Sequence, residues 1–130
     1  MLTVKNPPSV AAPNGFYSHS IEVPANARWL VTAGQAGVRP DGTLPEGFEA
    51  QLDQVWKNTV AFLNDSGFGV EDIVRLNVYS TDPSGLKFLA THREKYLSPN
   101  HIPTSTWVVI SQLANPDWVV EMETIAAKAG

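Results

Sequence analysis

Hydrophobic and polar residues along this chain follow two spacings, one typical of helices and one typical of strands. Apolar residues recur every three or four positions from Phe48 to Leu63, which predicts a long helix with one buried stripe. A second, shorter stripe at residues 85–97 includes Arg93 among its positions, and Ser84 precedes it as a candidate N-cap. The chain therefore contains two predicted helices.

Five other stretches alternate between apolar and polar residues, which predicts strands. They cover residues 17–23, 28–32, 73–80, 104–111 and 118–126. Alternation predicts one shared face for Val74, Leu76 and Val78. The order of elements is ββαβαββ, and helices of this length connect strands of one sheet by crossing over a face. We therefore predict one α+β domain over residues 1–130, with both helices on one face of a single sheet.

The segment TWVVIS, residues 106–111, is apolar on both of its predicted faces. Trp107 and Val109 share one face, whereas Val108 and Ile110 share the other. Because the helices cover only one side of the sheet, the other side needs a different cover. A second copy of the chain is the favoured cover, and a strand deep in the sheet of a monomer is the alternative.

Composition narrows the functional classes. The chain has no cysteine, which excludes disulfides and thiolate chemistry and fits a reducing, cytoplasmic compartment. Its net charge of −4 argues against a nucleic-acid partner. Apolar runs of about five residues are far shorter than a membrane span, so no membrane partner is expected.

Two carboxylates in the last predicted strand are the first candidates for chemistry. Glu121 and Glu123 lie on the same face, roughly 7 Å apart, between apolar neighbours. Exclusion of water and mutual repulsion would raise one pKa and create a general acid or a base that positions water. The alternative is that both side chains face solvent or pair with Arg75 or Arg28.

Other polar residues give weaker signals. His19, His92 and His101 have no metal-ligand spacing, so no metal site is expected; His19 is a candidate pocket residue and the other two are expected at the surface. Ser105 and Thr106 lack the G-x-S-x-G context of a nucleophile. The glycines in Gly34-Gln35-Ala36-Gly37 indicate a turn that ends a strand rather than a phosphate loop.

Four short motifs resemble the RidA/YjgF family, also called L-PSP endoribonuclease, and the similarity extends over residues 7 to 127. The matching segments are Gly15-Phe16-Tyr17-Ser18, Thr32-Ala33-Gly34-Gln35, Val78-Tyr79-Ser80-Thr81-Asp82 and Val120-Glu121-Met122-Glu123-Thr124-Ile125-Ala126. The family patterns are G-P-Y-S, S-G-Q, V-Y-L-T-D and V-E-I-E-A-I-A. Together, in this order, they identify the chain as a member of the family.

The resemblance implies a chorismate-mutase-like fold assembled as a homotrimer around a central barrel, with a small-molecule site in each cleft between subunits. It also implies hydrolysis of enamines and imines without a cofactor. On this basis Glu121 is the catalytic residue that positions water, and Tyr17 and Gly34 contact the ligand. The remaining predicted ligand-binding residues are Gln35, Thr104, Thr106 and Trp107.

One position departs from the family pattern. Family members carry P-A-R-S-[CT]-V, whose arginine binds the substrate carboxylate, whereas this chain has Ile102-Pro103-Thr104-Ser105-Thr106-Trp107, and Thr104 is taken as the residue in place of that arginine. Threonine cannot form the bidentate pair, and its loss should cost about 2–5 kcal/mol of binding. We therefore expect a ligand without the usual α-carboxylate, unless Arg75 or Arg28 replaces the missing group.

Three functions remain open at this point. The favoured one is a hydrolase that acts on an imine, an enamine or a related C–N bond, with a substrate other than the standard 2-imino acid. The second function, a trimer that binds a ligand without catalysis, has nearly the same support from the sequence. An endoribonuclease ranks third, because the chain is acidic and has no basic stripe.

Overall fold

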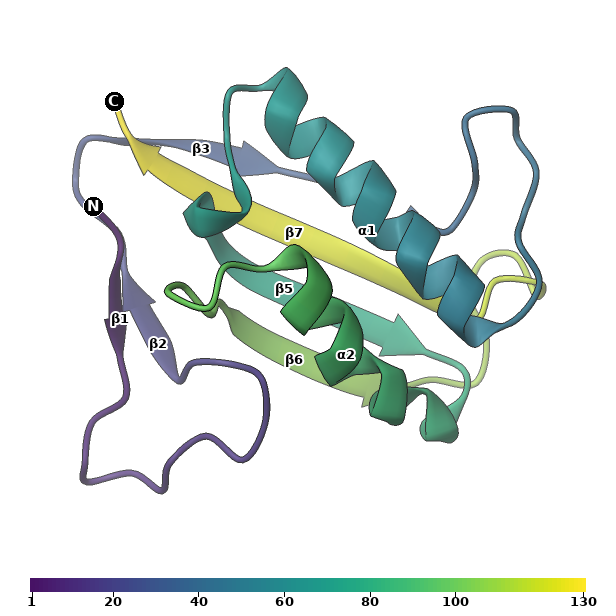
Figure 1. The fold of residues 1–130 in the computed structure, drawn as a ribbon, viewed down its shortest axis with the longest axis horizontal. Coiled ribbons are helices and arrows are strands. Elements are labelled where there is room, and N and C mark those ends of the chain that lie inside the picture. Colours follow the sequence, from purple (N-terminus) through teal and green to yellow (C-terminus); the bar gives the residue numbers. More distant parts are fainter.

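The computed structural model describes residues 1–130 as one mixed sheet with two long helices and a separate hairpin (Figure 1). The main sheet has the strand order β3-β7-β5-β6, and β4 pairs with the far end of β7. The elements are β1 Thr3–Lys5, β2 Ser20–Glu22, β3 Ala27–Val31, β4 Gln35–Ala36, α1 Phe48–Asp65, β5 Ile73–Ser80, α2 Leu86–Tyr96, β6 Thr104–Val109 and β7 Val120–Ala129, with 3₁₀ turns at Val70–Asp72 and Pro83–Gly85.

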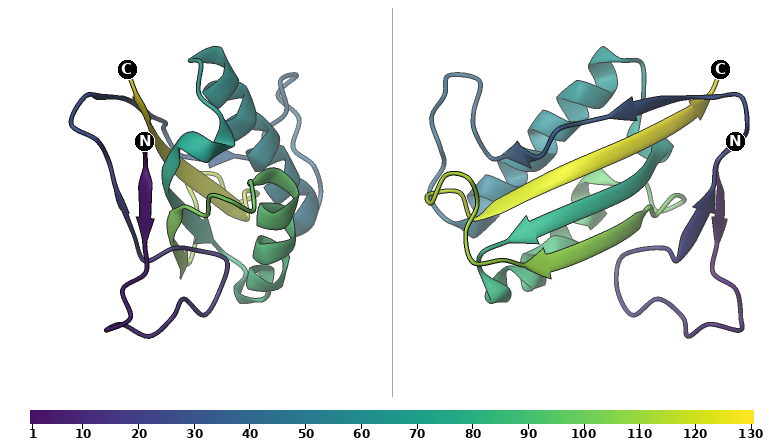
Figure 2. Two further views of the ribbon diagram at one scale, coloured as in Figure 1. Left: turned by 60° about the vertical axis from the view of Figure 1, so that its left-hand side comes forward. Right: turned by 180° about the vertical axis from the view of Figure 1, so that it is seen from behind.

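The helices α1 and α2 cover the same face of the sheet, as predicted, and the opposite face is uncovered (Figures 1 and 2). Only β5 and β6 are parallel; β7 runs antiparallel to all its neighbours. The predicted α+β class is therefore confirmed. We call the uncovered side the open face. No helix is long and apolar enough to cross a membrane.

The core lies between α1 and the central strands. Leu52, Val55 and Trp56 of the helix are fully buried, as are Leu76 and Met122 of the sheet. The helix ends at Asp65, and Gly67, which adopts a positive φ of 76°, turns the chain away from it. Burial of one stripe of α1 against β5 and β7 fixes which face of each strand points inward.

The first predicted strand differs from expectation. Residues 17–23 yield only β2, which pairs with β1 in a two-stranded sheet apart from the main one. The segment before β2 is held to the main sheet at Ser18, whose amide donates to Pro103 O at 3.0 Å and whose hydroxyl donates to Ile102 O at 2.5 Å. These local bonds replace a continuous strand ladder, and one isolated bridge, from Ser18 to Thr104, joins this segment to the main sheet.

The predicted turn at residues 34–37 is instead the resumption of a strand. After β3 the chain breaks its pairing over Ala33-Gly34, and β4 then pairs with β7, placing Gln35 opposite Met122 and Ala36 opposite Glu121. At the break, Thr32 N donates to Thr124 O and Thr124 N donates to Thr32 Oγ1. The interruption brings the backbone of Gly34 alongside β7.

Two smaller expectations are wrong for local reasons. A register shift in β5 buries Ile73 fully and leaves Val74 half-buried, so Val74 does not share the inner face. Ser84 does not cap α2: it lies in the 3₁₀ turn before the helix, and its amide donates to the Asp82 carboxylate, which caps that turn, at 2.9 Å. Pro83 and Ser84 form the intervening 3₁₀ turn.

His92 and His101 are buried rather than exposed. His92 Nδ1 lies 3.0 Å from Phe88 O within α2, and His101 Nε2 lies 2.6 Å from Ile73 O. Each ring thus has a carbonyl partner, which makes burial of an imidazole acceptable. Both histidines are structural, and no cluster of potential metal ligands occurs in the chain.

Candidate functional site

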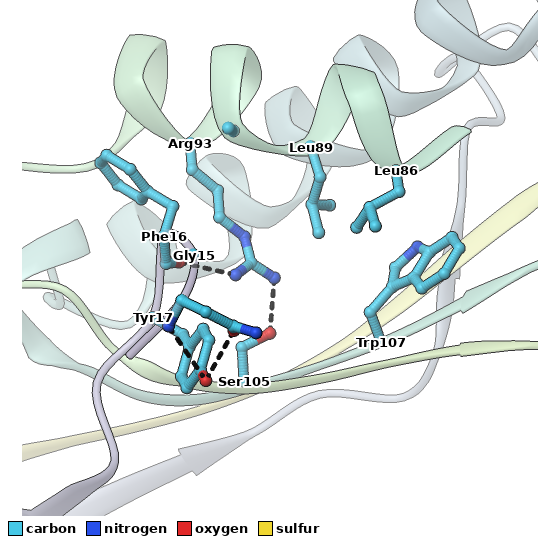
Figure 3. Close-up of a pocket in the computed structure, with 10 residues that line it drawn as sticks. Gly15, Phe16, Tyr17, Leu86, Leu89, Arg93, Ser105 and Trp107 are labelled. Carbon is cyan, nitrogen blue, oxygen red and sulfur yellow. Dashed lines mark hydrogen bonds between the residues drawn. The ribbon is translucent and has the colours of Figure 1, made fainter. Parts of the chain in front are cut away.

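A pocket of about 360 Å³ opens between α2, β6 and the loop before Ser18 (Figure 3). The helix supplies Leu86, Leu89, Ala90 and Arg93; the strand supplies Ser105 and Trp107; the loop supplies Asn14, Gly15, Phe16 and Tyr17. Three distant parts of the sequence therefore meet here. Two of the predicted ligand-binding residues, Tyr17 and Trp107, are among them.

Arg93 is the charged group of this pocket. Its side chain is buried, with 2% of the residue exposed. One terminal nitrogen donates to Phe16 O at 2.8 Å and the other donates to Ser105 Oγ at 2.5 Å, as Figure 3 shows. No carboxylate forms an ion pair with it, and burial lowers its pKa to about 10.

Two buried donors in the pocket have no partner. They are Nε of Arg93 and Nε1 of Trp107. The hydroxyl of Tyr17, by contrast, donates to Asn14 Oδ1 at 3.0 Å. Buried N–H groups are almost always hydrogen-bonded, so two such donors without a partner in one pocket are unusual.

The second group of predicted residues lies on the open face, two strands away. Glu121 alternates with Val120 and Met122, which point into the core, so its side chain points outward. A Cβ atom added to Gly34 would collide with the Glu121 carboxylate, so the missing side chain at residue 34 is what lets the carboxylate lie there. Glu121 has no hydrogen-bond partner among the side chains or backbone groups of the chain.

Burial, and secondly the charge of Glu123, raises the pKa of Glu121 above its ordinary value. Glu123 itself accepts a hydrogen bond from Tyr79 Oη at 2.5 Å. This hydrogen bond is the main reason why the pKa of Tyr79 is raised. The two glutamates therefore differ: Glu123 has a partner, and Glu121 is free to act on another molecule.

The alternative that these glutamates pair with arginines is wrong. Arg75 donates to Thr106 Oγ1 at 2.7 Å, and Arg28 lies over the ring of Phe68, 4.4 Å from its centre. Neither arginine lines the pocket. Within one chain, neither one replaces the missing strand arginine.

In the structure, the residue that corresponds to the family arginine is Ser105 rather than Thr104. Thr104 donates its hydroxyl to Val74 O at 2.6 Å and does not line the pocket, whereas Ser105 does. Counted from Pro103, the arginine of P-A-R-S also falls on Ser105. Thr106, bonded to Arg75, lies on the open face with Glu121, and Gln35 lies in β4.

The position of Arg93 in the sequence is itself a signal. Arginine within the apolar stripe of a helix is unusual, because the stripe faces the core. The signal did not reveal that the side chain would reach Phe16 and Ser105, both far away in the sequence. His19 is not a pocket residue: its Nε2 lies 2.6 Å from Ala11 O.

Comparison with known proteins places this geometry in a family. The family model described as endoribonuclease L-PSP matches residues 8–128. A RutC family protein of Aquifex aeolicus is 35% identical over 124 residues, which cover 93% of this chain and 95% of that protein.

Solved structures agree with the sequence match. The conserved Rid-family protein YyfB of Yersinia pestis, whose function is unknown, superimposes with a TM-score of 0.88 at 26% identity and covers 98% of both chains. RidA from the Antarctic bacterium Psychrobacter sp. gives 0.71 at 33% identity, covering 90% of this chain and 92% of that one. The fold is thus the chorismate-mutase-like α+β fold of Rid proteins. The chain belongs to the RidA/YjgF family.

Proposed function

We propose that this protein hydrolyses the C–N bond of a small imine or enamine and releases a carbonyl compound and ammonia. The observation that carries the proposal is the state of Glu121, a half-buried carboxylate with a raised pKa, no hydrogen-bond partner and the bare backbone of Gly34 beside it. Such a carboxylate is suited to hold one water molecule and to exchange protons with it.

The chemistry needs no cofactor. An enamine first gains a proton on carbon and loses one from nitrogen, which makes it an imine. Glu121 then removes a proton from water as the oxygen bonds to the imine carbon, and the nitrogen gains a proton to give a carbinolamine. Finally the hydroxyl loses its proton, the C–N bond breaks, and nitrogen leaves with that electron pair and a further proton as ammonia. Glu121 can carry these protons because its pKa lies closer to neutrality than that of an ordinary glutamate.

The pocket and Glu121 belong to opposite faces of the sheet, so we propose that two copies of the chain complete the site. Edge strand β6 carries exposed Val108 and Val109, and the open face carries Trp29 and Val31, which are 55% and 68% exposed. Apolar surface of this kind supports burial against another copy. A homotrimer in which the pocket of one subunit meets Glu121 of the next fits both the family resemblance and these surfaces.

The test is an enzyme assay with 2-aminoacrylate generated in place by a serine dehydratase, followed through the rate at which the keto acid appears. We expect the wild-type protein to accelerate this step, and Glu121→Gln to lose about 10²–10⁴-fold of the acceleration. Glu123→Gln is the matched control, because it changes the neighbouring carboxylate of the same strand face. Lack of acceleration, or equal loss in both variants, would overturn the proposal and favour a binding protein without catalysis.

A further inference from the structure

We infer that Arg93 is the carboxylate anchor of this pocket, so that the ligand is a small organic acid with an apolar part. The inference deepens the proposed function and rests on the same site, for which it names the substrate class. It differs from the expectation drawn from the sequence, which was a ligand without a carboxylate.

The first argument is the missing counter-ion. A guanidinium that is 2% exposed has lost most of its hydration, and a buried charge is normally paired with an opposite one. Arg93 has a carbonyl and a hydroxyl as partners and no carboxylate. Phe16 and Ser105 hold the guanidinium in place but leave its charge uncompensated, at the wall of a cavity large enough for a small molecule.

The second argument is the number of remaining donors. Guanidinium has five N–H groups, and two of those of Arg93 are used, which leaves three, including Nε–H, without a partner in the chain. Trp107 lines the same cavity, and its Nε1 is a second buried donor without a partner. A carboxylate accepts several hydrogen bonds through its two oxygens, and a neutral amide or alcohol accepts fewer.

The other residues that line the pocket indicate the chemistry of the rest of the ligand. Leu86 and Leu89 line the pocket between Arg93 and Trp107, and Figure 3 shows both leucine side chains directed into this space. The indole ring and the leucines offer an apolar surface next to the cation. A short aliphatic or flat acid satisfies both parts of the pocket.

The third argument concerns position 105. The strand arginine of the family pattern is replaced here by Ser105, and the guanidinium of Arg93 touches the hydroxyl of that same residue from α2. A cation is therefore present at this point although it comes from the helix. The loss of the strand arginine is not a loss of positive charge from the pocket.

The test measures binding rather than catalysis. 2-Oxobutanoate and its neutral amide, 2-oxobutanamide, are titrated separately into the wild-type protein, and affinities are taken from calorimetry. We expect the acid to bind at least tenfold more tightly than the amide. Equal affinities, or no binding of the acid at millimolar concentration, would overturn the inference.

Variants assign the preference to one residue. Arg93→Gln should lose the preference for the acid, Arg93→Lys should keep part of it, and Arg39→Gln, an exposed arginine bonded to Thr43 in the turn before α1, should keep all of it. A purely structural role of Arg93 would lower the melting temperature without removing the preference for the acid. If Arg93→Gln does not fold, the wild-type comparison of acid and amide still decides.

Failure of this inference and failure of the proposed function have different signatures. Tight, Arg93-dependent binding of 2-oxobutanoate without hydrolysis of 2-aminoacrylate leaves the inference standing and removes the enzyme. Glu121-dependent hydrolysis that is as fast for 2-aminoacrylamide as for 2-aminoacrylate leaves the enzyme standing and removes the carboxylate anchor.

Discussion

Gly34 and Glu121 fit together on the open face, and a Cβ atom at residue 34 would lie only 2.7 Å from the Glu121 Cδ atom. Gly34→Ala should therefore push the carboxylate out of place without disturbing the core, because a glutamate side chain can rotate toward solvent. We expect the hydrolysis rate to fall at least tenfold, by analogy with other small displacements of catalytic groups. The measurement is kcat with 2-aminoacrylate.

Gly42→Ala is the matched control for this substitution. Gly42 has a φ of 87° and no atom within 4 Å of an added Cβ. The change should cost about 1 kcal/mol of folding stability and leave the activity unchanged. Wild-type activity in Gly34→Ala would show that the Glu121 position is not important for the reaction.

A relocated arginine provides the second prediction. Arg93→Ser should weaken 2-oxobutanoate binding about 10- to 100-fold, and adding Ser105→Arg should restore it to within about tenfold of wild type. Adding Thr104→Arg instead should restore nothing, because Thr104 is directed to the Val74 carbonyl and not to the pocket. Rescue by residue 104 rather than 105 would contradict the one-residue shift described above.

The raised pKa of Glu121 makes folding stability depend on pH. Folding favours the protonated carboxyl, so this favourable effect is complete below pH 4.5 and disappears as pH rises through the folded-state pKa. Glu121→Gln should therefore have a higher free energy of unfolding than wild type at pH 7, and the difference should shrink in acid. Urea unfolding at several pH values checks this; a variant less stable than wild type at pH 7 would contradict it.

Asp53 links the two helices and provides the opposite pH dependence. Burial alone would raise its pKa, but hydrogen bonds from Tyr96 at 2.5 Å and Lys95 at 2.9 Å outweigh burial and lower the pKa to about 2. The stability from this carboxylate is present above pH 3.8 and is lost as pH falls toward 2.

Asp53→Asn should therefore lower the free energy of unfolding at pH 7 by about 1 kcal/mol, a value reduced for solvent screening. It should also flatten the dependence between pH 4 and pH 2. Glu46→Gln, which changes an exposed carboxylate without an ion pair, serves as control. Parallel pH profiles of Asp53→Asn and wild type would count against this account.

The proposed assembly predicts a change in mass. The wild-type protein should have a mass three times the 14.1 kDa of one chain by light scattering. Val31→Glu should reduce the mass to that of one chain, because a charge on an apolar contact surface is costly to bury. Phe62→Glu, on the solvent side of α1 and 41% exposed, should leave it unchanged. A single-chain mass for the wild type would remove the shared site.

Residue spacing alone predicted the helices and the central strands, because burial of one stripe or one face dictates their period. Alternation did not predict that β2 leaves the main sheet. The cause is a pair of hydrogen bonds from Ser18 to the carbonyls of Ile102 and Pro103, which are 84 and 85 positions further along the chain. The same applies to β4, whose pairing with β7 depends on an interruption between Thr32 and Gln35.

The candidate site was predicted less completely than the fold. Glu121 could be singled out because a carboxylate between buried neighbours is unusual in any strand. Arg93 could not be placed, because a long side chain reaches several ångströms from its own backbone and its partners come from distant elements. The sequence gives the position of the Arg93 backbone, whereas tertiary packing determines where the charged guanidinium lies.

The loop that carries Asn14, Gly15, Phe16 and Tyr17 forms one wall of the pocket, and it joins the main sheet beside Thr104 through bonds made by Ser18. The side chains of this wall can therefore vary without a change in the strands or helices beneath, as long as the Phe16 carbonyl keeps its hydrogen bond to Arg93. Homologues can thus diverge in the molecules they accept through a handful of residues near the N-terminus, while the machinery around Glu121 stays the same.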